Sequence, residues 1–137
     1  MIIADTGFFL TIANGRDRDH QRARTTASRL REPLITTWPV VTETSHLLVT
    51  RLGHAALMAF VASARAGAFS VFGLDPTHWP RLERLMTQYA ELPMDLADAS
   101  LVLLAEELGH GRILSTDRRD FRTYRWKSRK PFTNLLE

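Results

Sequence analysis

A chain of 137 residues has the length of one ordinary domain, and we expect residues 1–137 to form a single domain. Its hydrophobic fraction of 45% and charged fraction of 24% are typical of a globular protein, which excludes a wholly disordered chain. The chain has no cysteine, so disulfide frameworks, thiol nucleophiles and iron–sulfur sites are excluded, and a metal site would use carboxylates, imidazoles or backbone oxygens.

No apolar run approaches the length of a membrane span, and the apolar first residues lack the basic region of a signal peptide. We therefore expect a cytoplasmic protein that does not associate with a membrane.

The net charge is only +3, but 16 of the 18 basic residues are arginine, which binds phosphate groups through two parallel hydrogen bonds. Genome composition alone can also produce an arginine-rich chain. The basic residues concentrate in two segments, 16–31 and 118–130, and this placement favours nucleic acid as a partner. The candidate contacts are Arg16, Arg18, Arg118 and Arg119.

Apolar runs and helical patterns alternate along the chain. The runs predict strands at Met1–Ala4, Leu34–Thr37, Phe69–Phe72 and Arg112–Leu114, with a fifth strand at Phe121–Trp126 on an edge of the sheet. The helical patterns predict helices at Thr6–Ala13, Asp19–Arg31, Pro39–Leu52, 57–64, 76–92 and Leu96–Leu108. Pro39 suits the first turn of its helix, Gly53 ends it, and Asp95 is a good N-cap for the most apolar helix. This alternation predicts a three-layer α/β sandwich with a mostly parallel, about five-stranded central sheet.

Four acidic residues fall where such a fold would bring them together. Asp5 follows the first strand and Asp117 the fourth, while Glu43 and Asp98 lie near the starts of two helices. In open parallel sheets, ligands bind beyond the carboxyl ends of the strands, so we expect these four acids to meet at that edge. Each acid alone has a structural explanation as a helix cap, a solvated residue or part of a turn. Their joint placement favours a site.

Clustered carboxylates repel one another unless a cation compensates their charge. Ligation by oxygen alone suits Mg²⁺ or Mn²⁺, and one or two ions with their bound waters support hydrolysis of a phosphodiester. The spacings Glu43-x-x-His46 and Glu107-x-x-His110 match those of di-iron helical bundles, but the strand pattern contradicts an all-helical fold.

Four motifs in this order resemble the PIN-domain ribonucleases, and more narrowly the VapC-type toxins of type II toxin–antitoxin pairs. They are Ile2-Ile3-Ala4-Asp5-Thr6, Thr42-Glu43, Met94-Asp95-Leu96-Ala97-Asp98-Ala99, and Ile113-Leu114-Ser115-Thr116-Asp117-Arg118-Arg119-Asp120-Phe121. The resemblance covers essentially the whole chain. It implies a PIN-like α/β fold and an Mg²⁺- or Mn²⁺-dependent endoribonuclease, usually a homodimer, that a cognate antitoxin protein inhibits.

The resemblance also assigns roles to residues. Asp5, Glu43, Asp98 and Asp117 match the family's catalytic and metal-binding acids, with Asp5 and Asp98 the expected direct ligands. Thr6, Thr116 and Asp120 match supporting positions near the site.

Two other functions stay open from the sequence. The first is a catalytically inactive PIN-like module that binds RNA without cleaving it, although all four acids are present. The second is a phospho-accepting receiver domain, which would need adjacent acids after the first strand, where this chain has only Asp5.

Overall fold

The computed structural model describes all residues 1–137, and at its centre lies a sheet of five parallel strands in the order β3-β2-β1-β4-β7. The strands are β1 (Ile2–Ala4), β2 (Leu34–Thr37), β3 (Phe69–Phe72), β4 (Arg112–Leu114) and β7 (Thr133–Asn134). The predicted α/β class and the parallel sheet are confirmed. Receiver domains have the strand order 2-1-3-4-5, so the observed order excludes that alternative.

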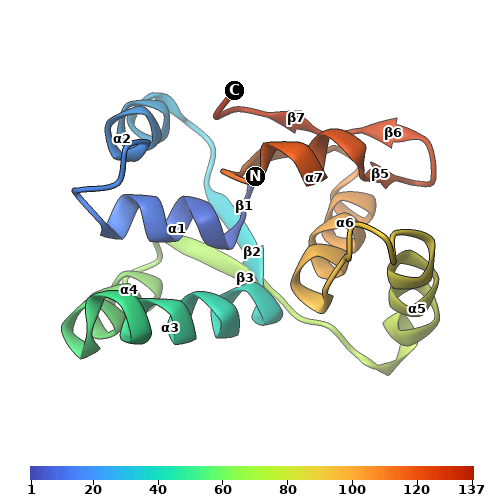
Figure 1. Ribbon diagram of the computed structural model, residues 1–137, viewed down its shortest axis with the longest axis horizontal. Coiled ribbons are helices and arrows are strands. Elements are labelled where there is room, and N and C mark those ends of the chain that lie inside the picture. The colour runs from blue at the N-terminus through green and yellow to red at the C-terminus, as the bar shows by residue number, and fades with distance from the viewer.

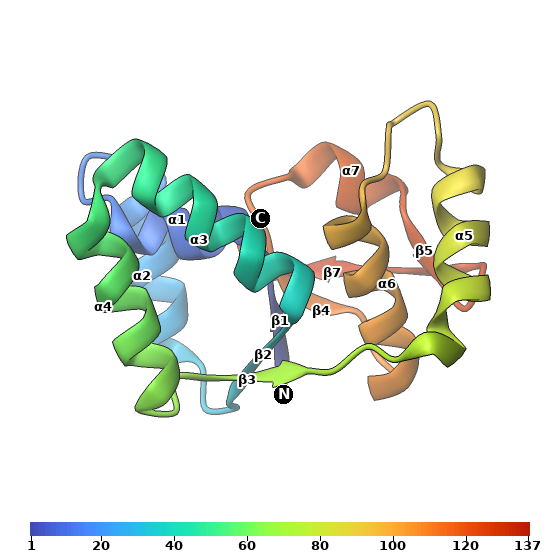
Figure 2. The same ribbon diagram turned by 90° about the horizontal axis from the view of Figure 1, so that it is seen from below.

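Helices cover both faces of this sheet (Figures 1 and 2). The helical elements are α1 (Thr6–Ala13), α2 (His20–Arg29), α3 (Trp38–Leu52), α4 (His54–Arg65), the 3₁₀ turn η1 (Pro76–His78), α5 (Trp79–Gln88), α6 (Leu96–Leu108) and α7 (Arg118–Thr123). Figure 2 shows α1 to α4 on one side of the strands and α5 and α6 on the other. The result is the expected three-layer sandwich.

Helix α6 forms the core of the second layer, packed between the sheet and α5. Eight of its 13 residues are buried, and they include Leu101, Leu104 and Ala105, which are fully enclosed. This burial on nearly every side explains why its sequence is apolar all round rather than amphipathic. No helix in the structure combines the length and apolarity that crossing a membrane requires.

The predicted fifth strand at Phe121–Trp126 is wrong. The first half of this segment belongs to α7, which begins where the Asp117 side chain accepts a hydrogen bond from the backbone N–H of Asp120. Phe121 and Tyr124 are three residues apart, which puts both rings on the same buried side of a helix. Only β5 (Arg125–Trp126) is extended, and it pairs antiparallel with β6 (Lys130–Pro131) outside the main sheet. The fifth strand of the central sheet is β7, near the C-terminus.

The helix predicted from residue 76 is divided. Asp75 caps the short turn η1 by accepting a hydrogen bond from the backbone N–H of Thr77 at 2.8 Å. A second proline, Pro80, then lies in the first turn of α5, where the missing N–H costs no helical hydrogen bond.

Candidate active site

The four predicted acids line one pocket of about 340 Å³ at the carboxyl edge of the sheet. Asp5 follows β1, Asp117 follows β4, Glu43 lies in the second turn of α3 after β2, and Asp98 lies in the first turn of α6. The pocket is completed by Thr6, Gly7, Leu10, Leu47, Arg51, Pro93, Asp95, Thr116 and Asp120. The structure therefore brings together every acid and hydroxyl residue that the sequence singled out for this site.

Asp5 is the most deeply buried of the four acids. Its Oδ1 accepts a hydrogen bond from the backbone N–H of Thr6 at 2.7 Å, and its Oδ2 accepts one from the hydroxyl of Ser115 at 2.9 Å. Burial nevertheless raises the pKa of Asp5 to about 6, because the two hydrogen bonds do not fully replace water around the charged form. Asp5 thus caps α1, and a positive charge beside it would stabilise its ionised form.

Asp98 and Asp95 form a reciprocal cap at the start of α6. The backbone N–H of Asp98 donates to Oδ1 of Asp95 at 2.8 Å, and the backbone N–H of Asp95 donates to Oδ2 of Asp98 at 3.4 Å. The hydroxyl of Tyr124 donates to the same Oδ2 at 3.2 Å. Burial raises the pKa of Asp98, and the negative charges of Asp95 and Asp5 raise it further. The expected N-cap role of Asp95 is confirmed.

The remaining two acids have raised pKa values for the same reasons. Burial raises the pKa of Asp117, and the side chain of Asp120 adds to the effect. Burial also raises the pKa of Glu43, with the charge of Asp95 as a second cause. None of these four carboxylates forms an ion pair with a basic side chain of the chain.

The chemistry of the pocket fits a hard divalent cation. The acids offer oxygen donors, and none of the four predicted carboxylates forms an ion pair. As the side chains stand, no three acidic or histidine residues are arranged to ligate one ion together. Mg²⁺ requires only one or two carboxylates, because it keeps several of its waters. The residues therefore suit an ion that is held partly through water.

Two residues of the site were not singled out from the sequence. The hydroxyl that contacts the acids directly is that of Ser115, the neighbour of the predicted Thr116. Arg51 is the single basic residue that lines the pocket, and it forms no ion pair within the chain. The spacing of Glu43, Leu47 and Arg51 at intervals of four places them on one helix face, so this arginine was detectable from the sequence.

The four candidate RNA contacts are exposed or partly exposed residues of two segments, and none of them lines the pocket. Arg16 and Arg18 occupy the loop between α1 and α2, and Arg118 and Arg119 begin α7 directly after Asp117. Arg118 reaches Asp19 at the start of α2 with an N–O distance of 3.8 Å. The two basic segments, far apart in sequence, are therefore neighbours in space.

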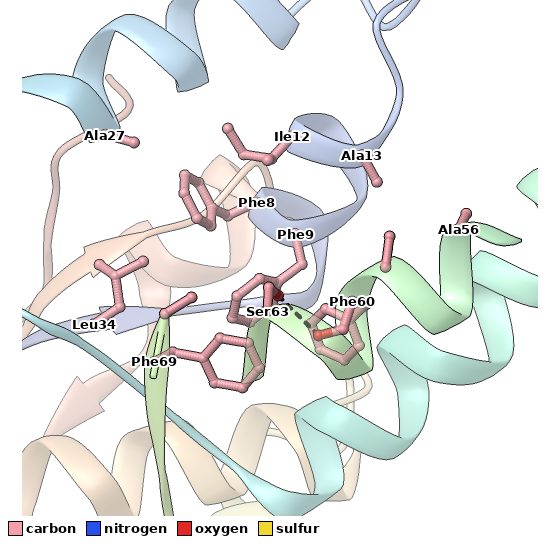
Figure 3. Close-up of a pocket in the computed structure, with 12 residues that line it drawn as sticks. Phe8, Phe9, Ile12, Ala13, Ala27, Leu34, Ala56, Phe60, Ser63 and Phe69 are labelled. Carbon is pink, nitrogen blue, oxygen red and sulfur yellow. Dashed lines mark hydrogen bonds between the residues drawn. The ribbon is translucent and has the colours of Figure 1, made fainter. Parts of the chain in front are cut away.

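A second hollow, of about 440 Å³, is lined by residues of α1, α2, β2, α4 and β3 (Figure 3). Eleven of its 12 lining residues are hydrophobic, and the rings of Phe9, Phe60 and Phe69 form a cluster with centroids 4.9 to 5.3 Å apart. The hydroxyl of Ser63 donates to the backbone oxygen of Phe60 at 2.8 Å, so the single polar side chain is already satisfied. This hollow offers apolar contact and no charge.

An α/β sandwich that delivers four acids from separate elements to one pocket is the arrangement that the sequence motifs led us to expect. The model of the PIN domain family matches residues 2–127, and the chain belongs to this family. Among curated proteins it is similar to ribonuclease VapC26 of Mycobacterium tuberculosis, with 27% identity over 124 residues that cover 90% of this chain and 92% of the relative.

The fold is also similar to a solved structure. The crystal structure of Mycobacterium tuberculosis VapC20, described as a toxin that cleaves the sarcin–ricin loop, matches with a TM-score of 0.78. The match covers 87% of this chain and 92% of VapC20 at 22% sequence identity. The resemblance to PIN-domain proteins of the VapC type is thereby confirmed.

Proposed function

We propose that this protein is a metal-dependent endoribonuclease, the toxin of a toxin–antitoxin pair. The observation that carries the proposal is the convergence of Asp5, Glu43, Asp98 and Asp117 in one pocket, with pKa values raised by burial. Its relatives, a ribonuclease and an RNA-cleaving toxin, support it.

Asp5 and Asp98 would hold Mg²⁺ or Mn²⁺ directly, because they are the two acids that fixed hydrogen bonds orient from several sides. Asp117 and Glu43 would be the further acidic ligands of the site, which would hold one ion or two. A divalent ion bound there supplies a water of lowered pKa and neutralises charge on the scissile phosphate. Cleavage between phosphorus and the 3′-oxygen would leave a 5′-phosphate on one product and a 3′-hydroxyl on the other.

RNA would be held by arginines rather than by the acids. Arg51 lines the pocket from α3 and would contact the phosphate there. Arg16, Arg18, Arg118 and Arg119 would contact the RNA backbone on either side. Binding dominated by phosphate contacts weakens steeply as salt rises.

The test is cleavage of labelled RNA by the purified protein with Mg²⁺ or Mn²⁺, in parallel with a chelator. We expect cleavage only with the metal, and no detectable cleavage by Asp98→Asn. An asparagine can still accept the hydrogen bonds that now reach Oδ2 of Asp98, so the variant keeps its fold. Tight RNA binding without cleavage in either metal would favour the inactive RNA-binding module instead, and unchanged cleavage in excess chelator would contradict a metal-dependent enzyme.

Inhibition by a cognate antitoxin protein is the regulatory part of the proposal. The apolar hollow in Figure 3 suits the apolar side chains of a protein segment, whereas it offers nothing to a phosphate backbone. Ala59 lines this hollow from α4 and is exposed, so Ala59→Arg should block antitoxin binding and leave RNA cleavage unchanged. Ala62→Arg is the matched control, because Ala62 is exposed on the same helix but does not line the hollow.

A homodimer is the expected assembly. Light scattering would then report about twice the chain mass of 15.6 kDa. Large apolar side chains are exposed on several helices and supply contact area; they include Trp38, Val49, Met58, Val61 and Trp79. A mass equal to that of one chain across the working concentration range would contradict this assembly.

A further inference from the structure

Ser115 connects two acids of the candidate active site. Its side chain is fully buried between β4 and α7. Its hydroxyl donates to Oδ2 of Asp5 at 2.9 Å and accepts the backbone N–H of Asp117 at 3.0 Å. The position of the Ser115 hydroxyl therefore sets the orientation of the Asp5 carboxylate and of the Asp117 backbone.

Ser115 is itself held by Asn134. The side chain of Asn134 donates from Nδ2 to the backbone oxygen of Ser115 at 2.8 Å, and its Oδ1 accepts the backbone N–H of Ser115 at 3.2 Å. The same Oδ1 accepts the backbone N–H of Leu136 at 3.1 Å. Because both backbone groups of Ser115 are paired with one amide, the residue has little freedom to turn.

The origin of this contact lies in the register of the C-terminal strand. Asn134 stands opposite Ile113 in the parallel pair β4–β7, and the backbone N–H of Leu135 donates to the oxygen of Ile113 at 2.8 Å. Strand β4 ends at Leu114, so the Asn134 side chain continues the hydrogen-bonded ladder beyond the end of the strand. The match to the PIN domain model ends at residue 127, so this support comes from outside the matched region.

We propose that Asn134 is a positioning residue of the active site, which acts through Ser115 to orient Asp5 and Asp117 for the metal. The inference rests on the proposed metal-dependent function for its consequence, although the hydrogen-bond relay is a property of the metal-free chain. Partners that orient metal ligands from behind typically change metal affinity by 10- to 100-fold when they are removed.

The relay can be tested without any metal. In Asn134→Ala we expect the amide protons of both Ser115 and Asp117 to exchange with solvent at least tenfold faster than in the wild type, as measured by NMR. Thr133→Ala is the matched control, because Thr133 is an exposed residue of the same strand and the hydrogen bonds to the Ser115 backbone come from Asn134. Unchanged protection of the Asp117 amide in the Asn134 variant would overturn the relay, whether or not the protein binds metal.

The consequence for the site is measured as Mn²⁺ affinity by calorimetry. We expect about a tenfold or greater loss in Asn134→Ala and none in Thr133→Ala. If Asn134 acts through Ser115, the double variant with Ser115→Ala should lose less affinity than the sum of the two single losses. Full additivity, or equal affinity in the wild type and Asn134→Ala, would overturn the positioning role.

Three further outcomes are distinguishable. If Asn134→Ala does not fold, Asn134→Asp takes its place, because it keeps the acceptor for the Ser115 N–H and loses only the donor to its carbonyl. Exchange of the Asp117 amide then decides the relay, because the Ser115 N–H keeps its acceptor in this variant. If the wild type binds Mn²⁺ but cleaves no RNA, the proposed function fails while the positioning role is still decided by affinity. If the wild type binds no Mn²⁺, the proposed function and the positioning role are both overturned.

Discussion

The hydroxyl of Tyr124 donates a hydrogen bond to Oδ2 of Asp98 across 3.2 Å, from a ring that is completely buried. Two neighbouring rings hold Tyr124 in place, with centroid distances of 5.2 Å to Phe121 and 5.0 Å to Tyr89. The aromatic packing at the end of α7 therefore fixes the phenol that contacts the candidate metal site. Asp98, in the first turn of α6, is oriented by a side chain that follows α7.

Tyr124→Phe keeps this packing and removes only the hydroxyl. We expect Mn²⁺ affinity to fall by up to about tenfold, since Asp98 loses a partner that fixes its rotamer. The free energy of unfolding should change by about 1 kcal/mol or less, the usual net value of one hydrogen bond. Calorimetry and urea denaturation measure the two quantities. Tyr89→Phe is the control, because the Tyr89 hydroxyl accepts the backbone N–H of Arg125 and contacts none of the acids; an equal loss of Mn²⁺ affinity in both variants would argue against a specific role for Tyr124.

The raised pKa values predict how the stability of the metal-free protein depends on pH. Asp5, with a pKa of about 6, and Asp98, whose pKa is also raised, retain protons in the folded state that the unfolded chain has released above about pH 4. Unfolding then releases protons, so the free energy of unfolding contributed by these groups falls as pH rises from 4 through their folded pKa values.

Asp98→Asn removes one of these contributions. Relative to the wild type without metal, we expect the variant to gain stability as pH rises from 5 to 8, by about 2 kcal/mol after allowance for partial exposure. Saturating Mn²⁺ should reverse the order at pH 8 by stabilising the wild type. Urea denaturation at several pH values checks both statements, and a stability difference that is constant with pH would contradict the raised pKa of Asp98.

Arg51→Ala tests whether the pocket arginine contacts the RNA phosphate. We expect the variant to keep its fold, because Arg51 is exposed and forms no ion pair, and to have about a tenfold lower kcat/KM. The slope of log affinity against log salt should fall by about one, as expected when one phosphate contact is lost. Arg65→Ala, on α4 and outside the pocket, is the control. An identical salt dependence in the Arg51 variant and the wild type would exclude this contact.

Gly7→Ala probes the close approach of α1 to the segment after β4. A Cβ at Gly7 would lie 1.9 Å from Oγ1 and 3.2 Å from Cβ of Thr116, so the threonine side chain would have to move. We expect a destabilisation of about 1–2 kcal/mol in the wild-type background. In Thr116→Ala the main clash is absent, and the better helix propensity of alanine should cancel or reverse the loss. Thermal unfolding of the four proteins measures this coupling; equal effects of Gly7→Ala in both backgrounds would contradict it.

The position of the site was predictable because it depends on local signals. A buried apolar run followed by Asp5, and the Asp95 cap three residues before Asp98, each mark an element end in the sequence. The parallel sheet then brings these ends to one edge, which is a general property of the fold class.

The C-terminal region was not predictable in the same way. Aromatic residues favour strands in general, which misled the interpretation of residues 121–126, whereas the cap at Asp117 and the spacing of Phe121 and Tyr124 favour a helical turn. Strand β7 has only two residues, Thr133 and Asn134, and no apolar pattern. The contacts of Asn134 with Ser115 join residues 19 positions apart, so no local signal reveals them.

Helix α1 has only eight residues, yet it forms a wall of both hollows. Phe8, Phe9 and Ile12 face the apolar one, while Thr6 and Leu10 line the acidic one. Helix α1 thus separates the surface that we propose for antitoxin binding from the pocket that we propose for RNA cleavage. Any substitution in α1 must be assayed for both antitoxin affinity and RNA cleavage, because neither measurement alone shows whether the apolar hollow or the acidic pocket was altered.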